Sequence, residues 1–89
     1  MELSDARRLI DGIDERIVDL FAERMRLVLV VRAEKEAVGL SVRQAAREEE
    51  ILDKVSVRAV SAGIPGYLIR KIYACVLAEM VHFQTGVEG

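Results

Sequence analysis

The feature that most constrains this sequence is an unbroken helical pattern over its first 38 residues. Ser4 or Asp5 can cap a helix at its start, and no proline follows before about Val38. The one glycine inside this stretch, Gly12, lowers helix propensity only modestly. Apolar residues recur at three- and four-residue steps, as they do on one face of an α-helix. These residues are Ala6, Ile10, Ile13, Ile17, Leu20, Leu27, Val28 and Val31.

The length of this predicted helix points to a partner molecule. A helix of about 34 residues is about 50 Å long, whereas a compact domain of this size is roughly 25–30 Å across. The rest of an 89-residue chain cannot cover the apolar stripe along the whole rod. A second copy of the chain is the simplest cover, so the length of the helix alone predicts an oligomer.

Two shorter helices are predicted to follow. Gly39 ends the first helix, and residues 40–42 form a short connection. The second helix is expected over residues 43–61 and the third over residues 67–85, with a turn at residues 63–66 that contains two glycines and the only proline. The positions expected to be buried are Ile51, Leu52, Val55 and Ala59, then Ile69, Ile72, Tyr73, Val76, Leu77, Met80 and Phe83. The sequence therefore predicts a single all-α domain over residues 1–89, with one long and two medium helices.

Composition argues against several kinds of partner. Aromatic residues make up only 4% of the chain and the net charge is −2, so neither stacking platforms nor a basic field is available for nucleic acid. Cys75, which we expect in the core, is the only cysteine, and this favours a reducing compartment over a disulfide-bonded one. The N-terminus does not have the pattern of a signal peptide, and the longest apolar run, residues 27–31, is too short to span a bilayer. We expect a cytoplasmic protein without a nucleic-acid or membrane partner.

Polar residues share helical faces with the predicted core. Arg24 and Lys35 are eleven residues apart, so they project on the same side of the first helix, about 16 Å from each other. On the second helix Glu48 is in line with apolar positions and Arg47 is beside it, and on the third helix Gln84 ends an apolar stripe. Together these faces would form a donor-rich pocket with net positive charge. Taken singly, such residues are more often solvated, because long cationic side chains reach water and charge runs form exposed faces.

Arg7 cannot serve this pocket from the same straight helix. It lies about 25 Å before Arg24 along the helix axis and roughly 100° around it. In an antiparallel pair of long helices, Arg7 of the partner subunit could reach the pocket. The sequence has no phosphate-binding glycine loop, no CxxC, no metal-spaced histidines and no nucleophile triad, so we expect neither a metal nor a cofactor. Cations with one carboxylate and one amide suit a reaction that depends on charge placement and conformational restraint.

In their order and spacing these residues resemble the all-helical (AroQ) class of chorismate mutases. The most distinctive stretches are residues 7–14, 20–24, 31–35 and 42–48, and Gln84 closes the set. The resemblance covers nearly the whole chain. It implies an intertwined homodimer with two shared sites. It also implies an isomerase that converts chorismate to prephenate without a cofactor, in the shikimate-pathway branch to phenylalanine and tyrosine.

The resemblance also implies catalytic roles. Lys35 and Gln84 would donate to the ether oxygen of chorismate, which gains negative charge as the C–O bond breaks. Glu48 would accept a hydrogen bond from the ring hydroxyl, and Arg47 would help to hold Glu48 and the substrate. The catalytic residues implied are Lys35, Gln84, Arg24 and Glu48.

The resemblance also implies which residues bind the substrate, and two of these positions differ from the family pattern. Arg24 and Arg7 of the partner subunit would hold the two carboxylates of chorismate and favour its compact conformer. Gln44 stands where an Asp is common, and its backbone N–H could still meet the ring hydroxyl. Met80 stands where a Ser can contact a substrate carboxylate, so a hydroxyl donor is lost.

Two other functions remain open from the sequence. An isochorismate-pyruvate lyase shares the helical scaffold and much of the cationic pocket. A non-catalytic helical module that dimerises or regulates an enzyme is the other alternative. Cations retained on an apolar seam argue against such a module, because it has no need of them there.

Overall fold

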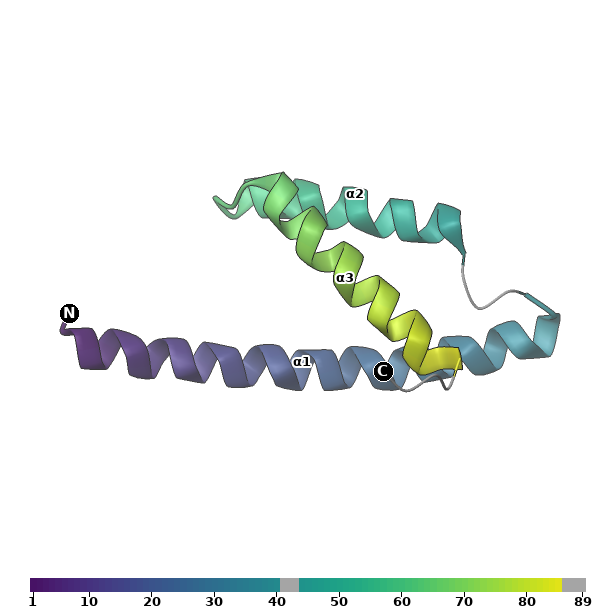
Figure 1. Ribbon diagram of the computed structural model, residues 1–89, viewed down its shortest axis with the longest axis horizontal. Helices are drawn as coiled ribbons and strands as arrows, with labels where there is room; N and C mark the ends of the chain where they lie inside the picture. The colour runs from purple at the N-terminus through teal and green to yellow at the C-terminus, as the bar shows by residue number, and fades with distance from the viewer. Residues whose placement is uncertain (41–43, 86–89) are drawn as a thin grey trace.

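The computed structural model describes residues 1–40 and 44–85, with only the backbone of Gln84 and Thr85. It contains three α-helices, α1 (Leu3–Val38), α2 (Ala45–Ser61) and α3 (Gly66–Thr85), and no strand within the described residues (Figure 1). The predicted all-α class, with one long and two medium helices, is confirmed. In the part of the chain that is described, none of the helices combines the length and the apolar character that crossing a membrane requires.

The start of α1 differs from the prediction. Glu2 occupies the N-cap position with an extended backbone, and its side chain makes no capping hydrogen bond. The expectation that Ser4 or Asp5 caps the helix is therefore wrong, because both residues already lie in its first turn. Asp5 instead pairs with Arg8 one turn further on. Its carboxylate also lies near the helix N-terminus, where the helix dipole favours negative charge.

Two glycines terminate α1 and α2. Gly39 and Gly63 have left-handed backbones, with φ angles of 74° and 85°. After α2, the N–H of Ile64 donates to the carbonyl of Ala59 at 2.8 Å, and the N–H of Gly63 donates to the carbonyl of Val60 at 3.1 Å. This pair of bonds is a Schellman cap, which satisfies carbonyls that the helix end would otherwise leave unbonded. The predicted ends of both helices are confirmed.

The two shorter helices begin close to their predicted positions. α2 begins at Ala45 rather than at residue 43, and Gln44 is extended at its N-cap. Residues 41–43, which include most of the predicted connection, lie outside the described residues. α3 begins at Gly66, one residue earlier than predicted and directly after Pro65. Proline has no N–H to donate, and the first residues of a helix have no intrahelical acceptor for one, so Pro65 fits this position.

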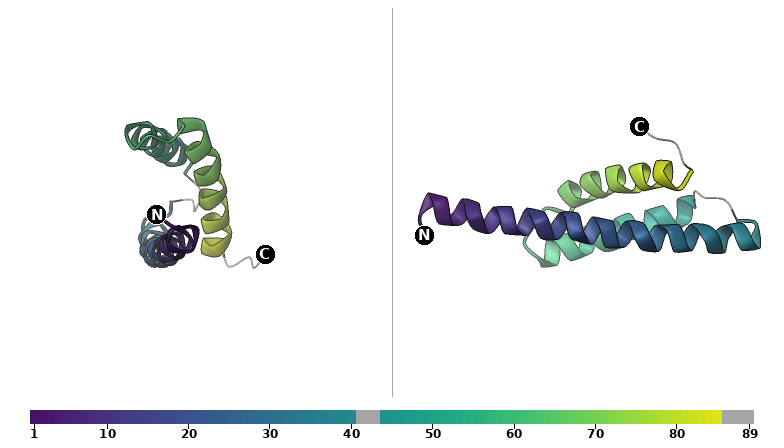
Figure 2. Two further views of the ribbon diagram at one scale, coloured as in Figure 1. Left: turned by 90° about the vertical axis from the view of Figure 1, so that its left-hand side faces the viewer. Right: turned by 90° about the horizontal axis from the view of Figure 1, so that it is seen from below.

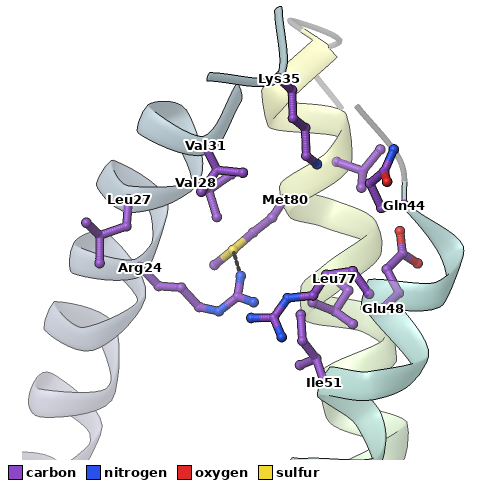
Figure 3. A pocket seen from close by; sticks show the side chains of 12 residues that line it. Arg24, Leu27, Val28, Val31, Lys35, Gln44, Glu48, Ile51, Leu77 and Met80 are labelled. Atoms are coloured by element: carbon purple, nitrogen blue, oxygen red, sulfur yellow. Dashed lines mark hydrogen bonds between the residues drawn. The ribbon is translucent and has the colours of Figure 1, made fainter. Parts of the chain in front are cut away.

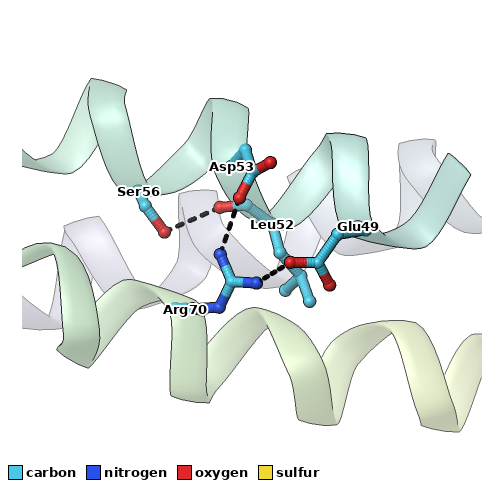
Figure 4. A network of polar contacts seen from close by, with 5 residues as sticks. All are labelled: Glu49, Leu52, Asp53, Ser56 and Arg70. Atoms are coloured by element: carbon cyan, nitrogen blue, oxygen red, sulfur yellow. Dashed lines mark hydrogen bonds and ion pairs between the residues drawn. The ribbon is translucent and has the colours of Figure 1, made fainter. Parts of the chain in front are cut away.

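α2 and α3 form a hairpin, and α3 then slants towards α1 (Figures 1 and 2). Arg70 on α3 joins the hairpin arms, because its guanidinium donates to Asp53 at 2.9 Å and also to Glu49, both on α2 (Figure 4). The hydrogen bonds to Asp53 and Glu49 raise the pKa of the Arg70 guanidinium above its ordinary value. The C-terminal half of α3 is the part that meets α1, and residues of all three helices line a cavity there.

A single chain leaves α1 largely uncovered. The molecule measures 54 × 25 × 20 Å, and α1 contributes no buried residue. The predicted apolar stripe is between 43% and 62% exposed at Ile10, Ile13, Ile17, Leu20, Leu27 and Val31. Within the described residues, the buried core consists of Ala59, Leu77 and Met80. The expectation that the rest of the chain cannot cover this rod is therefore confirmed.

Three predicted core positions on α3 are exposed instead. Ile72 and Phe83 are 47% and 48% exposed, and Cys75 is also exposed. α3 contacts α2 along one face and contacts α1 only near its C-terminal half. Ile72, Cys75 and Phe83 lie on one side of α3, and the described residues leave that side exposed. Periodicity marks these positions as apolar but does not show which of them a second helix covers.

The turn between α2 and α3 gives a first test of the fold. We expect Gly63→Ala to lower the free energy of unfolding by about 1 kcal/mol, because a side chain disfavours the left-handed backbone. Gly63→Asn is the matched control and should lose less, since Asn tolerates this conformation better than Ala does. Thermal unfolding of all three proteins at one protein concentration measures the difference. Equal stability of Gly63→Ala and the wild type would contradict the assignment of this turn.

Candidate active site

One cavity lies where α1, the first turn of α2 and the C-terminal half of α3 meet (Figure 3). Its volume is about 250 Å³, which suits a metabolite smaller than the drug-sized ligands of typical pockets. Its polar lining is Arg24, Lys35, Gln44, Arg47 and Glu48. Its apolar lining is Leu27, Val28, Val31, Ile51, Leu77, Met80 and Val81. The cavity therefore combines apolar walls with three cations and one carboxylate.

α1 supplies two of the cations. Arg24 and Lys35 are both half-buried, and both extend from α1 towards the other two helices (Figure 3). Their eleven-residue spacing keeps them on one face of a continuous helix, as the sequence predicts. Nη1 of Arg24 donates to Sδ of Met80, and Cζ of Arg24 lies 5.7 Å from the centre of the Tyr73 ring. Two groups on α3 thus fix the guanidinium of Arg24 at the wall of the cavity.

α2 supplies the carboxylate and the third cation. Glu48 lies in the first turn of α2, where the helix dipole favours a negative charge, and its Oε2 atom is shielded from solvent. Arg47 pairs with Glu50 at 2.7 Å, and Lys54 approaches the same carboxylate oxygen at 3.1 Å. Hydrogen bonding and charge from Lys54, followed by the charge of Arg47, lower the pKa of Glu50. Arg47 therefore reaches the cavity while taking part in an exposed ion cluster.

The structure brings together six of the eight residues that the sequence nominated. These are Arg24, Lys35, Gln44, Arg47, Glu48 and Met80. Arg7 is on α1 about 25 Å before Arg24 along the axis, far from the cavity of its own chain, as the sequence predicts. Gln84 continues α3 four residues after Met80, but its side chain lies outside the described residues.

Sequence reasoning missed one contact of the site and one residue of its apolar wall, Val81. Tyr73 was expected only as a core residue, yet its ring faces Arg24. Val81 and Leu77 line the cavity with Met80. The seven-residue spacing of Tyr73 and Met80, two turns of one helix face, is the signal that could have linked both residues to the same partner.

The lining of the cavity suits a small anionic ligand that also has apolar parts. Its cations come from two different helices, and apolar side chains lie between them. Charges in such a partly desolvated site interact more strongly than they would in water. Because the helices fix these groups before a ligand arrives, they can stabilise charge that develops during a reaction.

Comparison with known proteins places the chain in a family. Residues 6–85 match the family model described as chorismate mutase type II. The T-protein of Enterobacter agglomerans is 33% identical over 78 residues, which are 88% of this chain and 21% of that protein. The T-protein of Haemophilus influenzae is 36% identical over 77 residues, which are 86% of this chain and 20% of that protein. No solved structure matches the chain.

Because the family model covers most of its length, the chain belongs to the chorismate mutase type II family. It spans about a fifth of the length of the curated relatives that it matches.

Proposed function

We propose that this protein is a chorismate mutase, an isomerase that converts chorismate to prephenate in the biosynthesis of phenylalanine and tyrosine. The observation that carries the proposal is that Arg24, Lys35 and Glu48 line one cavity of about 250 Å³. Membership of the chorismate mutase type II family supports the same conclusion. The domain that carries this activity extends over residues 1–89, and the reaction takes place in the cytoplasm without a cofactor.

The reaction is a Claisen rearrangement, in which the ether C–O bond breaks as a new C–C bond forms. Both changes take place in one cyclic transition state of six atoms, so no covalent intermediate or proton transfer is needed. Arg24 and Arg7 of the partner subunit hold the two carboxylates and so favour the compact, reactive conformer. Lys35 and Gln84 donate to the ether oxygen as its negative charge grows. The hydrogen bonds from these donors to the ether oxygen are stronger in the transition state than in the ground state. They therefore raise kcat and not only the affinity for chorismate.

Glu48 fixes the substrate from the opposite side. Its carboxylate accepts a hydrogen bond from the ring hydroxyl, and Arg47 helps to hold both Glu48 and the substrate. The backbone N–H of Gln44, at the N-cap of α2, can meet the same hydroxyl. The burial of Oε2 and its place in the first turn of α2 support a Glu48 that is held in position before the substrate binds.

Met80 changes the character of the carboxylate site. It is only 6% exposed and contacts Arg24, so it presents a thioether where a hydroxyl donor would help to bind a carboxylate. Arg24 therefore contributes a larger share of the binding free energy of that carboxylate than it would beside a serine. A lower affinity for chorismate than in a serine-containing site is the expected consequence.

The active form in this proposal is an intertwined homodimer with two shared sites. The apolar stripe of α1 is exposed over a molecule 54 Å long, and this surface needs a cover. Arg7 lies too far from the cavity of its own chain to touch a substrate there. An antiparallel second copy would cover the stripe and bring its own Arg7 to the cavity.

The first test is the loss of chorismate absorbance with purified protein, with the product identified by chromatography. Formation of prephenate would support the proposal. Formation of pyruvate from isochorismate, with no prephenate from chorismate, would assign the protein as an isochorismate-pyruvate lyase. A folded dimer that is inactive on both substrates would leave the non-catalytic module.

A further inference from the structure

We propose that Tyr73 is a positioning residue for Arg24, whose guanidinium it holds at the wall of the cavity through the face of its ring. The proposal rests on the proposed function, since it links Tyr73 to the binding of a substrate carboxylate. The centre of the Tyr73 ring lies 5.7 Å from Cζ of Arg24. Tyr73 is not one of the described residues that line the cavity. Its contact with Arg24, which does line the cavity, is the route by which it would influence a bound substrate.

Met80 makes the second contact that fixes the guanidinium of Arg24. Its Sδ atom accepts a hydrogen bond from Nη1 of Arg24 (Figure 3). Met80 follows Tyr73 by seven residues, so both side chains project from the same face of α3. Because Met80 is only 6% exposed, its thioether is fixed in place. The guanidinium of Arg24 on α1 thus contacts the ring of Tyr73 and the sulfur atom of Met80, and both of these groups are positioned by α3.

Both contacts fix Arg24 without neutralising it. The face of an aromatic ring attracts a cation through the quadrupole of the ring, and a thioether is a weak acceptor. Neither group carries a negative charge. A carboxylate in the same place would compete with an anionic substrate for the guanidinium. These two contacts therefore keep the guanidinium in place while its positive charge stays available to a substrate carboxylate.

A fixed guanidinium should act on binding more than on chemistry. Arginine loses considerable side-chain freedom when it is immobilised by a ligand, and a residue that is already fixed loses less. The carboxylate that Arg24 binds keeps its charge throughout the rearrangement. The interaction is therefore about equal in the ground state and the transition state, and its loss raises KM while kcat changes little.

The test compares Tyr73→Leu, which removes the ring, with Tyr73→Phe, which keeps it. We expect Tyr73→Leu to raise KM for chorismate about tenfold, with kcat changed less than about threefold. Tyr73→Phe should restore KM to within about twofold of the wild type, because the face of the ring remains. Tyr67→Leu is the matched control, since Tyr67 is in the first turn of the same helix and is 75% exposed. Should Tyr73→Leu not fold, Tyr73→Met replaces it as a flexible apolar side chain without a ring.

A double-mutant cycle then separates positioning from simple packing. In an Arg24→Ala background, Tyr73→Leu should change KM by less than about twofold, because there is no guanidinium left to hold. A tenfold rise in that background as well would overturn the proposal, since Tyr73 would then act independently of Arg24. So would a Tyr73→Phe variant that is as impaired as Tyr73→Leu.

A second measurement does not depend on the enzymatic activity. In the ¹⁵N-labelled protein, the Nε–Hε signal of Arg24, assigned by its loss in Arg24→Lys, should be displaced by the ring current of Tyr73. The displacement should persist in Tyr73→Phe and disappear in Tyr73→Leu. A wild-type protein that shows this displacement but does not convert chorismate would contradict the proposed function and keep the contact. An Arg24 signal that is identical in all three proteins would overturn the contact itself.

Discussion

Replacement of Lys35 by Ala is expected to reduce kcat for chorismate by about 100- to 1,000-fold, the usual effect of removing one donor from a site where negative charge develops. Lys35 lines the cavity from the last turns of α1 and faces α2 (Figure 3). As the ether C–O bond breaks, its oxygen gains negative charge that the ammonium group of Lys35 can stabilise. The effect should therefore fall on kcat and kcat/KM together.

The fold should survive this substitution. The carbonyl of Lys35 accepts the hydrogen bond from Leu40 that closes the end of α1, and the backbone keeps this bond whatever the side chain. The loss of a cation near a helix C-terminus lowers stability by about 0.3–1 kcal/mol, too little to unfold the protein.

Lys71→Ala is the control for the Lys35 experiment. Lys71 is an exposed lysine on α3 that does not line the cavity in the described structure. Steady-state rates of chorismate conversion should show this variant within about twofold of the wild type, as is usual for an exposed site away from the chemistry. If a folded Lys35→Ala protein kept more than about a tenth of the wild-type kcat, Lys35 could not be the donor to the ether oxygen.

Features that depend on neighbours along the chain could be predicted from the sequence. The continuity of α1 follows from the absence of proline and the three- and four-residue steps of its apolar positions. Its end at Gly39 follows from the freedom of glycine to adopt a left-handed backbone. The common face of Arg24 and Lys35 follows from helix geometry alone. Two of the five polar residues that line the cavity could therefore be placed on one face before any contact between helices was known.

Features that depend on contacts between helices could not be predicted in this way. Periodicity marks Ile72 and Phe83 as apolar, but which side of α3 the other helices cover depends on contacts between helices, and both residues lie on the side that one chain leaves exposed. The slant of α3 towards α1 brings the ring of Tyr73 to Arg24, 49 residues away in sequence. The predicted N-cap of α1 was also wrong. Ser4 and Asp5 are both residue types that often cap a helix, but the helix already begins after Glu2.

Arg7→Ala and Lys35→Ala should each have a kcat/KM for chorismate on the order of 100-fold below the wild type, and activity should return when the two variants are combined in one dimer. Arg7 lies about 25 Å from Arg24 along α1, so in the proposed dimer it serves the cavity of the other subunit. Removing one partner of a charge pair typically lowers binding on the order of 100-fold. In a mixed dimer, the cavity that retains Lys35 also receives an intact Arg7 from the partner subunit. The other cavity carries both defects.

The mixed dimer can be isolated by coexpression of the two variants with different affinity tags and purification over both. One of its two sites is intact, so its kcat/KM per dimer should be about half of the wild-type value. The kcat/KM of each parental dimer should remain on the order of 100-fold below the wild-type value. A site built from a single chain gives the opposite result, because both sites of the mixed dimer would then carry one defect.

A second mixed dimer makes this comparison specific. Arg24 and Lys35 line the same cavity from the same chain, so a dimer of Arg24→Ala with Lys35→Ala has one defect in each cavity. Its kcat/KM for chorismate should stay as low as in the two parental dimers. Arg8→Ala, which removes an exposed neighbour of Arg7 that pairs with Asp5, should keep wild-type activity as a homodimer. Recovery in the Arg7 and Lys35 combination alone would mean that residues 25 Å apart on one helix act in one site because two copies of that helix run in opposite directions. Recovery in neither combination would mean that Arg7 acts within its own chain or not at all, and that the exposed stripe of α1 is covered in some other way.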